Sequence, residues 1–265
     1  MIFCTKKIRF FFVLFVFVFF TKLQSQKLYF SSTDLKTQIE SIILKENNPK
    51  RDTLELKKRL NFLKESSNKK FHILHDALLA KGYSVFFDKT NPKSEYYYLQ
   101  SIQKAKKSND LSLIIWTQVN YSQYLYFYCQ IDKLIPIVLK TMQESNQIDA
   151  SEMILPAETF KFFGWIMFTI EDDSALDFLK KSMHYMKETS SESAGVLNTI
   201  GNYYFKKKDL KNAMHYFNQS EVAALKIGDS VRYAKVLGDK ALVYNQKGDV
   251  DTAVNLLKKD ITYSQ

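Results

Sequence analysis

Two segments near the end of the chain match each other at a constant offset, and this match constrains the fold most. One segment reads LNTIGNYYFKKKDLKNAMHYF from Leu197, and the other reads LGDKALVYNQKGDVDTAVNLL from Leu237. In the first, Leu197, Ile200, Gly201 and Tyr204 have the spacing of one helix face. A helix pair with one apolar stripe cannot bury it alone, so repetition of the pair predicts a stacked array.

The matched positions hold small residues, large apolar residues and an aspartate. Asp209 and Asp249 are placed to cap the second helix of each unit. Small residues fall where two antiparallel helices must approach closely, and large residues fill the space beside them. Gly164 and Ala175 occupy the small positions of a fainter, earlier copy. The other repeat-defining residues are Leu197, Gly201, Tyr204, Ala213, Phe217, Leu237, Ala241, Tyr244, Ala253 and Leu257.

Weaker copies extend the pattern toward the N-terminus. Small residues at Gly82, Ser122 and Gly164 follow one another at nearly the interval that separates Gly201 from Ala241. Short polar breaks separate segments of helical length throughout this region. We therefore predict about five helix pairs over residues 69–265, clearest at 194–265, behind an N-terminal helix pair within 26–68.

The order of small and large residues around the helix-turn-helix resembles the tetratricopeptide repeat (TPR) family. The resemblance implies an all-α fold, a right-handed superhelical solenoid of antiparallel helix pairs. The offset from Leu197 to Leu237 exceeds the family's usual repeat of about 34 residues and fits its longer-helix variants. Lys240 is a departure, because the family has an apolar residue there.

The N-terminus has the layout of a secretory signal peptide. A basic stretch, Lys6 to Arg9, precedes the unbroken apolar run Phe10 to Phe20, and small Ser25 offers a cleavage point. The run is well short of the ~20 residues that span a bilayer as a helix. We predict a signal peptide over 1–25, with an uncleaved N-terminal anchor as the alternative. Membrane contact is expected only through that anchor or through a C-terminal region missing from this sequence. The mature chain is then exported, to the periplasm or the cell surface.

Composition favours helices and offers little for catalysis. Only 7 Gly and 4 Pro occur in 265 residues, too few breakers for an all-β sandwich. His72 and His75 lie close together in the sequence, which places no third metal ligand beside them. Phosphate-binding glycine loops and nucleophile–base motifs are absent from the sequence. We expect no enzyme activity, no cofactor and no metal.

The positive charge does not indicate nucleic acid. The formal charge is +10, but the lysines are scattered along the chain. The densest run, FKKKD at 205–209, falls in the turn between two paired helices. Export would also separate this part of the chain from most nucleic acids. We predict a protein or peptide partner instead.

By resemblance to the family, that partner would lie in the groove lined by the first helices of the pairs. Amides and ammonium groups there could hold a peptide's backbone or carboxylate, and aromatic rings could hold its apolar side chains. The groove residues implied are Lys161, Trp165, Asn198, Asn202, Lys206, Lys235, Leu242 and Asn245.

Three functions fit these features. The favoured one is an exported, non-enzymatic interaction scaffold, resembling the extracytoplasmic repeat regions of bacterial signalling proteins with a histidine-kinase or helix-turn-helix output. A small-molecule or glycan-uptake accessory protein would need a closed apolar pocket near Trp116, Trp165 and residues 121–128. A self-associating scaffold would use the last helix, since the sequence ends without a polar capping helix. That ending also leads us to expect a longer protein.

Overall fold

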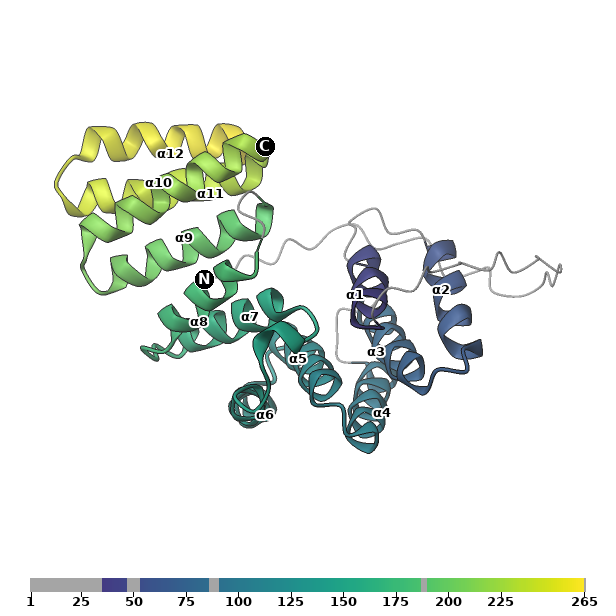
Figure 1. Cartoon of the computed structure of the whole chain (residues 1–265). Coiled ribbons are helices and arrows are strands. Elements are labelled where there is room, and N and C mark those ends of the chain that lie inside the picture. The colour runs from purple at the N-terminus through teal and green to yellow at the C-terminus, as the bar shows by residue number, and fades with distance from the viewer. Residues whose placement is uncertain (1–34, 47–52, 86–90, 187–189, 265) are drawn as a thin grey trace. The chain divides into compact units, whose positions relative to one another are not determined.

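The computed structural model describes residues 35–46, 53–85, 91–186 and 190–264. The proposed signal peptide lies outside the described residues. Every regular element within them is helical (Figure 1). The helices are α1 (Leu35–Glu46), α2 (Thr53–Glu65), α3 (Lys69–Val85), α4 (Pro92–Ser108), α5 (Leu111–Phe127), α6 (Ile131–Ser145), the short 3₁₀ helix η1 (Ala150–Glu152), α7 (Pro156–Thr169), α8 (Ala175–His184), α9 (Ser191–Lys206), α10 (Leu210–Ile227), α11 (Ser230–Gln246) and α12 (Val250–Ser264).

From α3 onward the helices pack in successive pairs, and short turns join the helices of the last four pairs. The pairs are α3 with α4, α5 with α6, α7 with α8, α9 with α10, and α11 with α12. The first helices of the pairs also contact one another in order, from α3 through α5, α7 and α9 to α11. Figure 1 shows this stacking in the green and yellow helices α9 to α12. The all-α helical-repeat solenoid expected from the sequence is confirmed.

The turn inside four of the pairs has one shared geometry. A residue with positive φ follows each first helix: Cys129 (φ 57), Glu171 (φ 62), Lys208 (φ 62) and Gly248 (φ 84). The next residue's N–H then donates to a carbonyl near the end of the helix, as in Asp209 to Tyr204 at 2.9 Å. This bond ends a helix with a left-handed residue. The turns therefore repeat with the same spacing as the small residues that precede them.

Aspartates then start the second helices. The Asp209 carboxylate accepts a hydrogen bond from the N–H of Asn212 at 3.0 Å, and Asp249 accepts one from Thr252 at 3.1 Å. Such caps satisfy backbone donors that the first turn of a helix leaves free. The predicted capping role of both aspartates is confirmed.

Glycines allow the closest approach within two pairs. A Cβ on Gly201 of α9 would lie 2.5 Å from ring carbons of Phe217 on α10. A Cβ on Gly164 of α7 would lie 2.9 Å from the backbone nitrogen of Leu179 on α8. Phe217 and Leu179 are both buried. In these two pairs, the helices therefore approach so closely that a side chain larger than glycine does not fit at the contact.

Most of the repeat-defining residues are in the core. Leu197, Gly201, Phe217, Leu237 and Ala241 are buried, and so are Gly164, Ala175, Ala213 and Ala253. Tyr204 and Tyr244 are half-buried. Leu257, the position matched with Phe217, is exposed, because no helix in the described part of the chain covers that side of α12.

Lys240 fills its normally apolar position by forming an ion pair. Its ammonium group lies 2.7 Å from a carboxylate oxygen of Glu221 on α10, and both side chains are largely buried. The pair joins α10 to α11 and compensates the buried charge.

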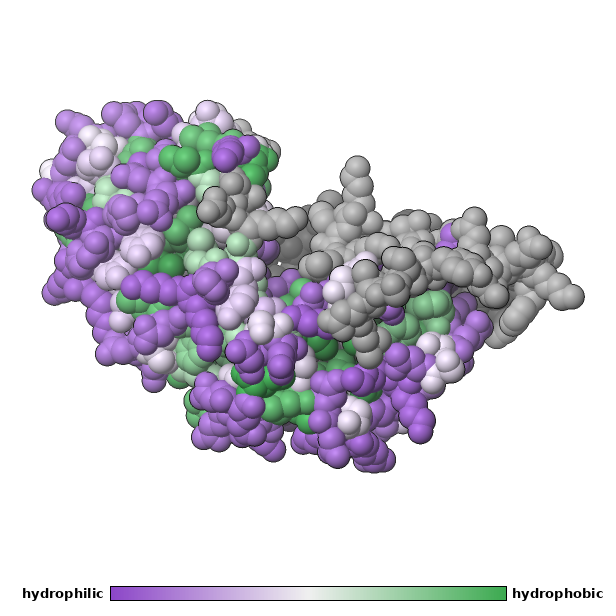
Figure 2. Space-filling view, in the orientation of Figure 1, coloured by the Kyte–Doolittle hydropathy of each residue, from purple (hydrophilic) through white to green (hydrophobic). Residues whose placement is uncertain are grey.

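The larger cores lie in the N-terminal part of the array. One groups Ile154 with buried residues of α1 to α5, including Leu63 and Trp116. The other groups residues of α3 to α8, including Leu125 and Phe163. Figure 2 shows a largely hydrophilic visible face, with hydrophobic residues gathered between the helices. Among the described helices, none combines the length and apolarity that crossing a membrane requires.

We predict that Gly201→Ala destabilises the array. The added methyl group would overlap the buried Phe217 ring, and overpacking costs about 1–3 kcal/mol, more than the up to about 1 kcal/mol of helix propensity that alanine gains. Urea unfolding followed by circular dichroism should show a free energy of unfolding about 1–2 kcal/mol lower.

Gly82→Ala is the matched control. Within the described ranges, its Cβ would meet only Leu56, at 3.5 Å, which is an ordinary contact. The control should be neutral or more stable than wild type, by up to about 1 kcal/mol. Equal behaviour of the two variants would contradict the close contact at Gly201.

Candidate binding groove

The first helices α7, α9 and α11 carry the residues that the sequence assigned to a groove. We call the surface formed by these residues the first-helix face: Lys161, Trp165, Asn198, Asn202, Lys206, Lys235, Leu242 and Asn245. The structure gathers three of them at one point and distributes the others along the three helices.

The gathering point is the carboxylate of Asp239 on α11. Its Oδ2 atom accepts hydrogen bonds from the amides of Asn198, at 2.6 Å, and Asn202, at 3.0 Å, both on α9. The ammonium group of Lys235 lies 3.3 Å from the same oxygen. Sequence reasoning missed Asp239. Its one signal was the i, i+4 spacing from Lys235, which places opposite charges on one helix face.

The two asparagines therefore work between repeats. Asn198 is only 4% exposed, and its amide NH₂ faces a carboxylate. Asn202 is half-buried and also donates to the backbone oxygen of Asn198 at 3.2 Å. Both amide donors are engaged, so they do not stand ready for a ligand's carboxylate, the role that the resemblance implied.

What the Asp239 site offers instead is acceptor capacity. The Oδ1 atom of Asn198 is buried and has no hydrogen-bond partner in the described part of the chain. The hydrogen bonds that described residues donate to the Asp239 carboxylate all reach Oδ2, which leaves Oδ1 without a donor among them. A carboxylate accepts through both oxygens. The site therefore suits a hydrogen-bond donor, such as a peptide N–H or a cationic side chain.

A second polar network crosses the three helices near the start of α9. Glu192 pairs with Lys161 of α7, and one of its oxygens lies 3.7 Å from the guanidinium group of Arg232 on α11. Arg232 also donates to the hydroxyl of Ser191 at 2.6 Å. The guanidinium group lies over Gly195, where a Cβ would overlap it. The glycine thus makes room for a charge that links neighbouring repeats.

The protonation of Glu192 reflects these neighbours. Partial burial raises the pKa of Glu192, but the hydrogen bond from Lys161 and the charges of Lys161 and Arg232 outweigh it and hold the pKa below the usual value. The carboxylate is therefore ionised at neutral pH, and the network contains both signs of charge.

The remaining predicted residues are exposed. Trp165 is 40% exposed and packs against Tyr126 of α5, with ring centroids 4.3 Å apart. Lys206 lies 4.5 Å from the ring centroid of Phe168 and 3.4 Å from a Glu171 oxygen. The last two predicted residues, Leu242 and Asn245 of α11, are also exposed.

The FKKKD run also has acidic neighbours. Lys207 forms an ion pair with Asp173, and Lys206 lies beside Glu171, so acidic side chains offset part of the run's charge.

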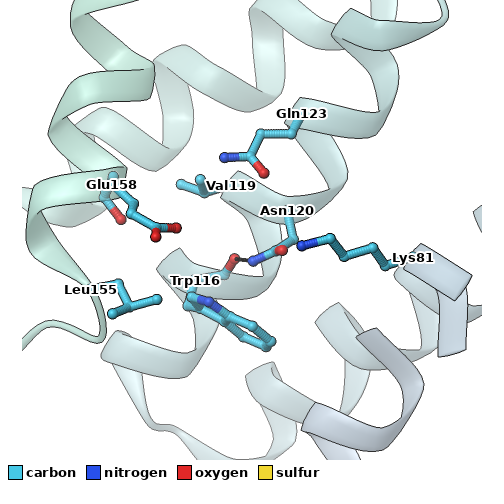
Figure 3. A pocket seen from close by; sticks show the side chains of 8 residues that line it. Lys81, Trp116, Val119, Asn120, Gln123, Leu155 and Glu158 are labelled. Atoms are coloured by element: carbon cyan, nitrogen blue, oxygen red, sulfur yellow. Dashed lines mark hydrogen bonds between the residues drawn. The ribbon is translucent and has the colours of Figure 1, made fainter. Parts of the chain in front are cut away.

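A small pocket lies between α3, α5 and α7 (Figure 3). Its volume is about 40 Å³, and Trp116 and Val119 line it beside the polar side chains of Asn120, Gln123 and Glu158. That is room for about one or two waters, whereas pockets for drug-sized ligands measure roughly 300–1,000 Å³.

The aromatic residues near this pocket fill a core. Tyr121 and Tyr124 are buried and pack against the ring of Tyr98. Trp165 does not line the pocket. The pocket beside Trp116 is therefore too small for the ligand that the small-molecule alternative requires.

The two candidate metal-binding histidines have other partners. A ring nitrogen of His72 lies 2.8 Å from the backbone oxygen of Ser66, and one of His75 lies 2.9 Å from the carboxylate of Asp76. Asp76 also pairs with Lys104 at 2.6 Å. In the part of the chain that the structure describes, no three metal-ligating side chains gather at one point.

Comparison with known proteins assigns the fold. No protein-family model matches the sequence, and no curated protein matches it significantly. Among solved structures, BtubC (BKLC) from P. vanneervenii superposes with a TM-score of 0.66, at 15% identity over 87% of this chain and 91% of that one. A putative kinesin light chain from Podosopora anserina with nearly identical TPR-like repeats gives 0.58, at 10% identity over 75% and 97%. The chain has a TPR-like fold.

Stacked helical repeats present an extended surface. In this array the first helices contribute one continuous row of side chains. Asp239 and the Glu192 network tie that row together across α7, α9 and α11.

We predict strong energetic coupling between Asn198 and Asp239. Asp239→Ala leaves the buried Asn198 N–H groups without an acceptor, which should lower the free energy of unfolding by about 1–3 kcal/mol. Asn198→Ala should have a similar cost, but the double variant should cost clearly less than the sum. A double-mutant cycle by urea unfolding measures this coupling, which we expect to be about 1 kcal/mol or more.

Lys235→Ala serves as the control, because Lys235 is exposed and its i, i+4 pair is worth only about 0.3–0.5 kcal/mol. Additive costs of Asn198→Ala and Asp239→Ala would mean that the hydrogen bond does not hold α9 to α11.

Proposed function

We propose that this protein is an exported, non-enzymatic TPR-like scaffold that binds an extended segment of a partner protein on its first-helix face. The proposal rests on one observation: an exposed aromatic ring and exposed charged side chains lie along the same three first helices as Asp239, one of whose two carboxylate oxygens has no donor among the described residues. Trp165 offers an apolar surface, Lys206 and Lys235 are exposed, and Asp239 has an oxygen free to accept.

The proposed ligand is matched to these groups. An extended peptide carries backbone N–H donors at regular intervals, and its side chains alternate in direction. One N–H or cationic side chain would donate to Asp239, and an apolar side chain would pack on Trp165. Aromatic residues often supply most of the energy of such contacts, because they bury a large area with few rotatable bonds.

Export and a signalling role complete the proposal. The apolar run Phe10 to Phe20 behind a basic stretch supports export. Within a signalling protein, this array would be the sensor or interaction part, with a histidine-kinase or helix-turn-helix output elsewhere in the polypeptide.

We expect Trp165→Ala to weaken partner binding at least about tenfold, the effect of losing a central aromatic contact. The full chain would be used to select binders from a displayed peptide library, and affinities would be measured by fluorescence anisotropy. Lys235→Ala should weaken binding less, because it removes an exposed charge.

Val222→Ala is the matched control for binding, because Val222 is exposed on α10, a second helix. A peptide whose affinity falls with Val222→Ala and not with Trp165→Ala would refute the first-helix face. Failure to select any peptide would also count against the proposal.

Export makes a separate prediction. Residues 1–34 fused to alkaline phosphatase, an enzyme that is active only outside the bacterial cytoplasm, should give activity in colonies. Val16→Arg, which puts a charge in the middle of the apolar run, should abolish that activity. Equal activity with and without the charge would contradict export by this segment.

A further inference from the structure

The last helix carries an apolar stripe that the described part of the chain leaves uncovered. Val250 is 54% exposed, Val254 42%, Leu257 43% and Ile261 61%. Their spacing of four, three and four residues places them along one face of α12. A neighbouring side of the helix packs on α11 and buries Ala253. Thus α12 has two apolar faces, of which one is covered.

The repeat shows what the uncovered stripe is suited to. One repeat earlier, Leu210 and Met214 of α10 occupy the positions of Val250 and Val254. They are partly buried against Val236 and Val243 of α11. The stripe on α12 therefore has the composition of a helix face that packs against another helix.

Leu242 on α11 extends the same surface. It corresponds to Asn202, which α11 half-buries in the preceding repeat, but Leu242 itself is exposed. We call these five residues the terminal face: Leu242, Val250, Val254, Leu257 and Ile261.

Charged residues beside the stripe identify what would cover it. Asp251 and Lys258 are both exposed, and they flank the stripe on the same side, about two helical turns apart. Among the described residues neither side chain has an ion-pair partner. The two charges have opposite sign and lie on either side of the middle of the stripe, Asp251 about 7 Å and Lys258 about 4 Å from it along the helix axis.

We propose that a second copy of this chain covers the terminal face, with the two α12 helices packed antiparallel about a two-fold axis. In that arrangement Val250 meets Ile261 of the other copy, and Val254 meets Leu257. Asp251 of each copy then lies opposite Lys258 of the other, so the symmetry forms the same ion pair twice. In a parallel arrangement Asp251 of one copy and Lys258 of the other would instead lie on opposite sides of the interface, so this ion pair could not form.

The size of the terminal face sets the strength of the dimer. Five apolar residues from each copy bury an area at the low end of the range for specific interfaces. Contacts of that size are weak and reversible. The dimer should therefore dissociate on dilution, and the exposed ion pairs should make it weaker at high salt.

Exchange of the two charges provides the test. Sedimentation velocity of the full chain, over about 1 µM to about 1 mM, should show a reversible monomer–dimer equilibrium. Asp251→Lys or Lys258→Asp alone puts like charges opposite each other twice and should weaken the dimer about tenfold. The double variant D251K/K258D restores both pairs with reversed sign and should return affinity to near the wild-type value.

Two further variants separate this surface from other sources of association. Val254→Asp should abolish the dimer, because it puts a charge in the middle of the stripe. Val222→Asp, at a valine on α10 that is more exposed than Val254, should leave it unchanged. Circular dichroism would establish that each variant is folded, and any association through the N-terminal apolar run is common to all of them.

Carbodiimide cross-linking of mixed ¹⁴N and ¹⁵N protein tests directly whether Asp251 and Lys258 of different copies are in contact. An Asp251–Lys258 link containing both isotopes would show that the pair joins two copies. The proposal is overturned if the chain is monomeric at every concentration, if D251K/K258D does not restore the affinity, or if Val254→Asp has no effect. If Val254→Asp has no effect, any association occurs through another surface. If the chain is monomeric, the terminal face is covered by a different protein or by a further segment of the polypeptide.

Discussion

The contact between Gly201 and the Phe217 ring sets how closely α9 and α10 approach, and the array depends on contacts of this kind. Since a Cβ at Gly201 would overlap the ring, the helix axes are held at the short separation that only glycine allows. Gly164 does the same against Leu179 in the preceding pair. A close pair presents a narrow apolar edge on each side, and stacking the next pair buries it. In four of the pairs, the repeated left-handed turn residue lies at a constant distance after the small residue and keeps these pairs in the same register.

Polar contacts between neighbouring repeats give the stack its specificity. Apolar stripes of similar composition could slide past one another, but Asp239 is held by two asparagines of the preceding first helix. Lys240 and Glu221 fix α11 against α10 in the same way. Unpaired, each of these buried groups would cost several kcal/mol of desolvation, so a shifted register would be penalised. The same residues shape the surface that a partner meets, and this is why the proposed binding site and the repeat contacts overlap at Asp239.

The first-helix face and the terminal face lie on different parts of the array, and we propose a different binding role for each. Partner binding is assigned to side chains of α7, α9 and α11, and self-association to α12. The faces share only Leu242. A dimer through α12 would place two first-helix faces in one particle, so a partner with two copies of its binding segment would be held more tightly than a partner with one. Variants of Trp165 and of Val254 distinguish the two roles.

The sequence alone determined the helical-repeat fold, since the constant offset between the repeats, the small residues and the capping aspartates are local features that act wherever they occur. The same patterns identified Gly201 and Ala213 as helix-contact positions and Asp209 as a helix cap. Only the tertiary structure decided what the asparagines of α9 do, because their partner Asp239 lies on the next first helix and no periodicity links them. It also decided that Leu257 is exposed although the matched Phe217 is buried, because burial depends on which helix comes to lie above a residue. Long-range pairing and coverage are properties of the packed array, and a single helix's sequence does not contain them.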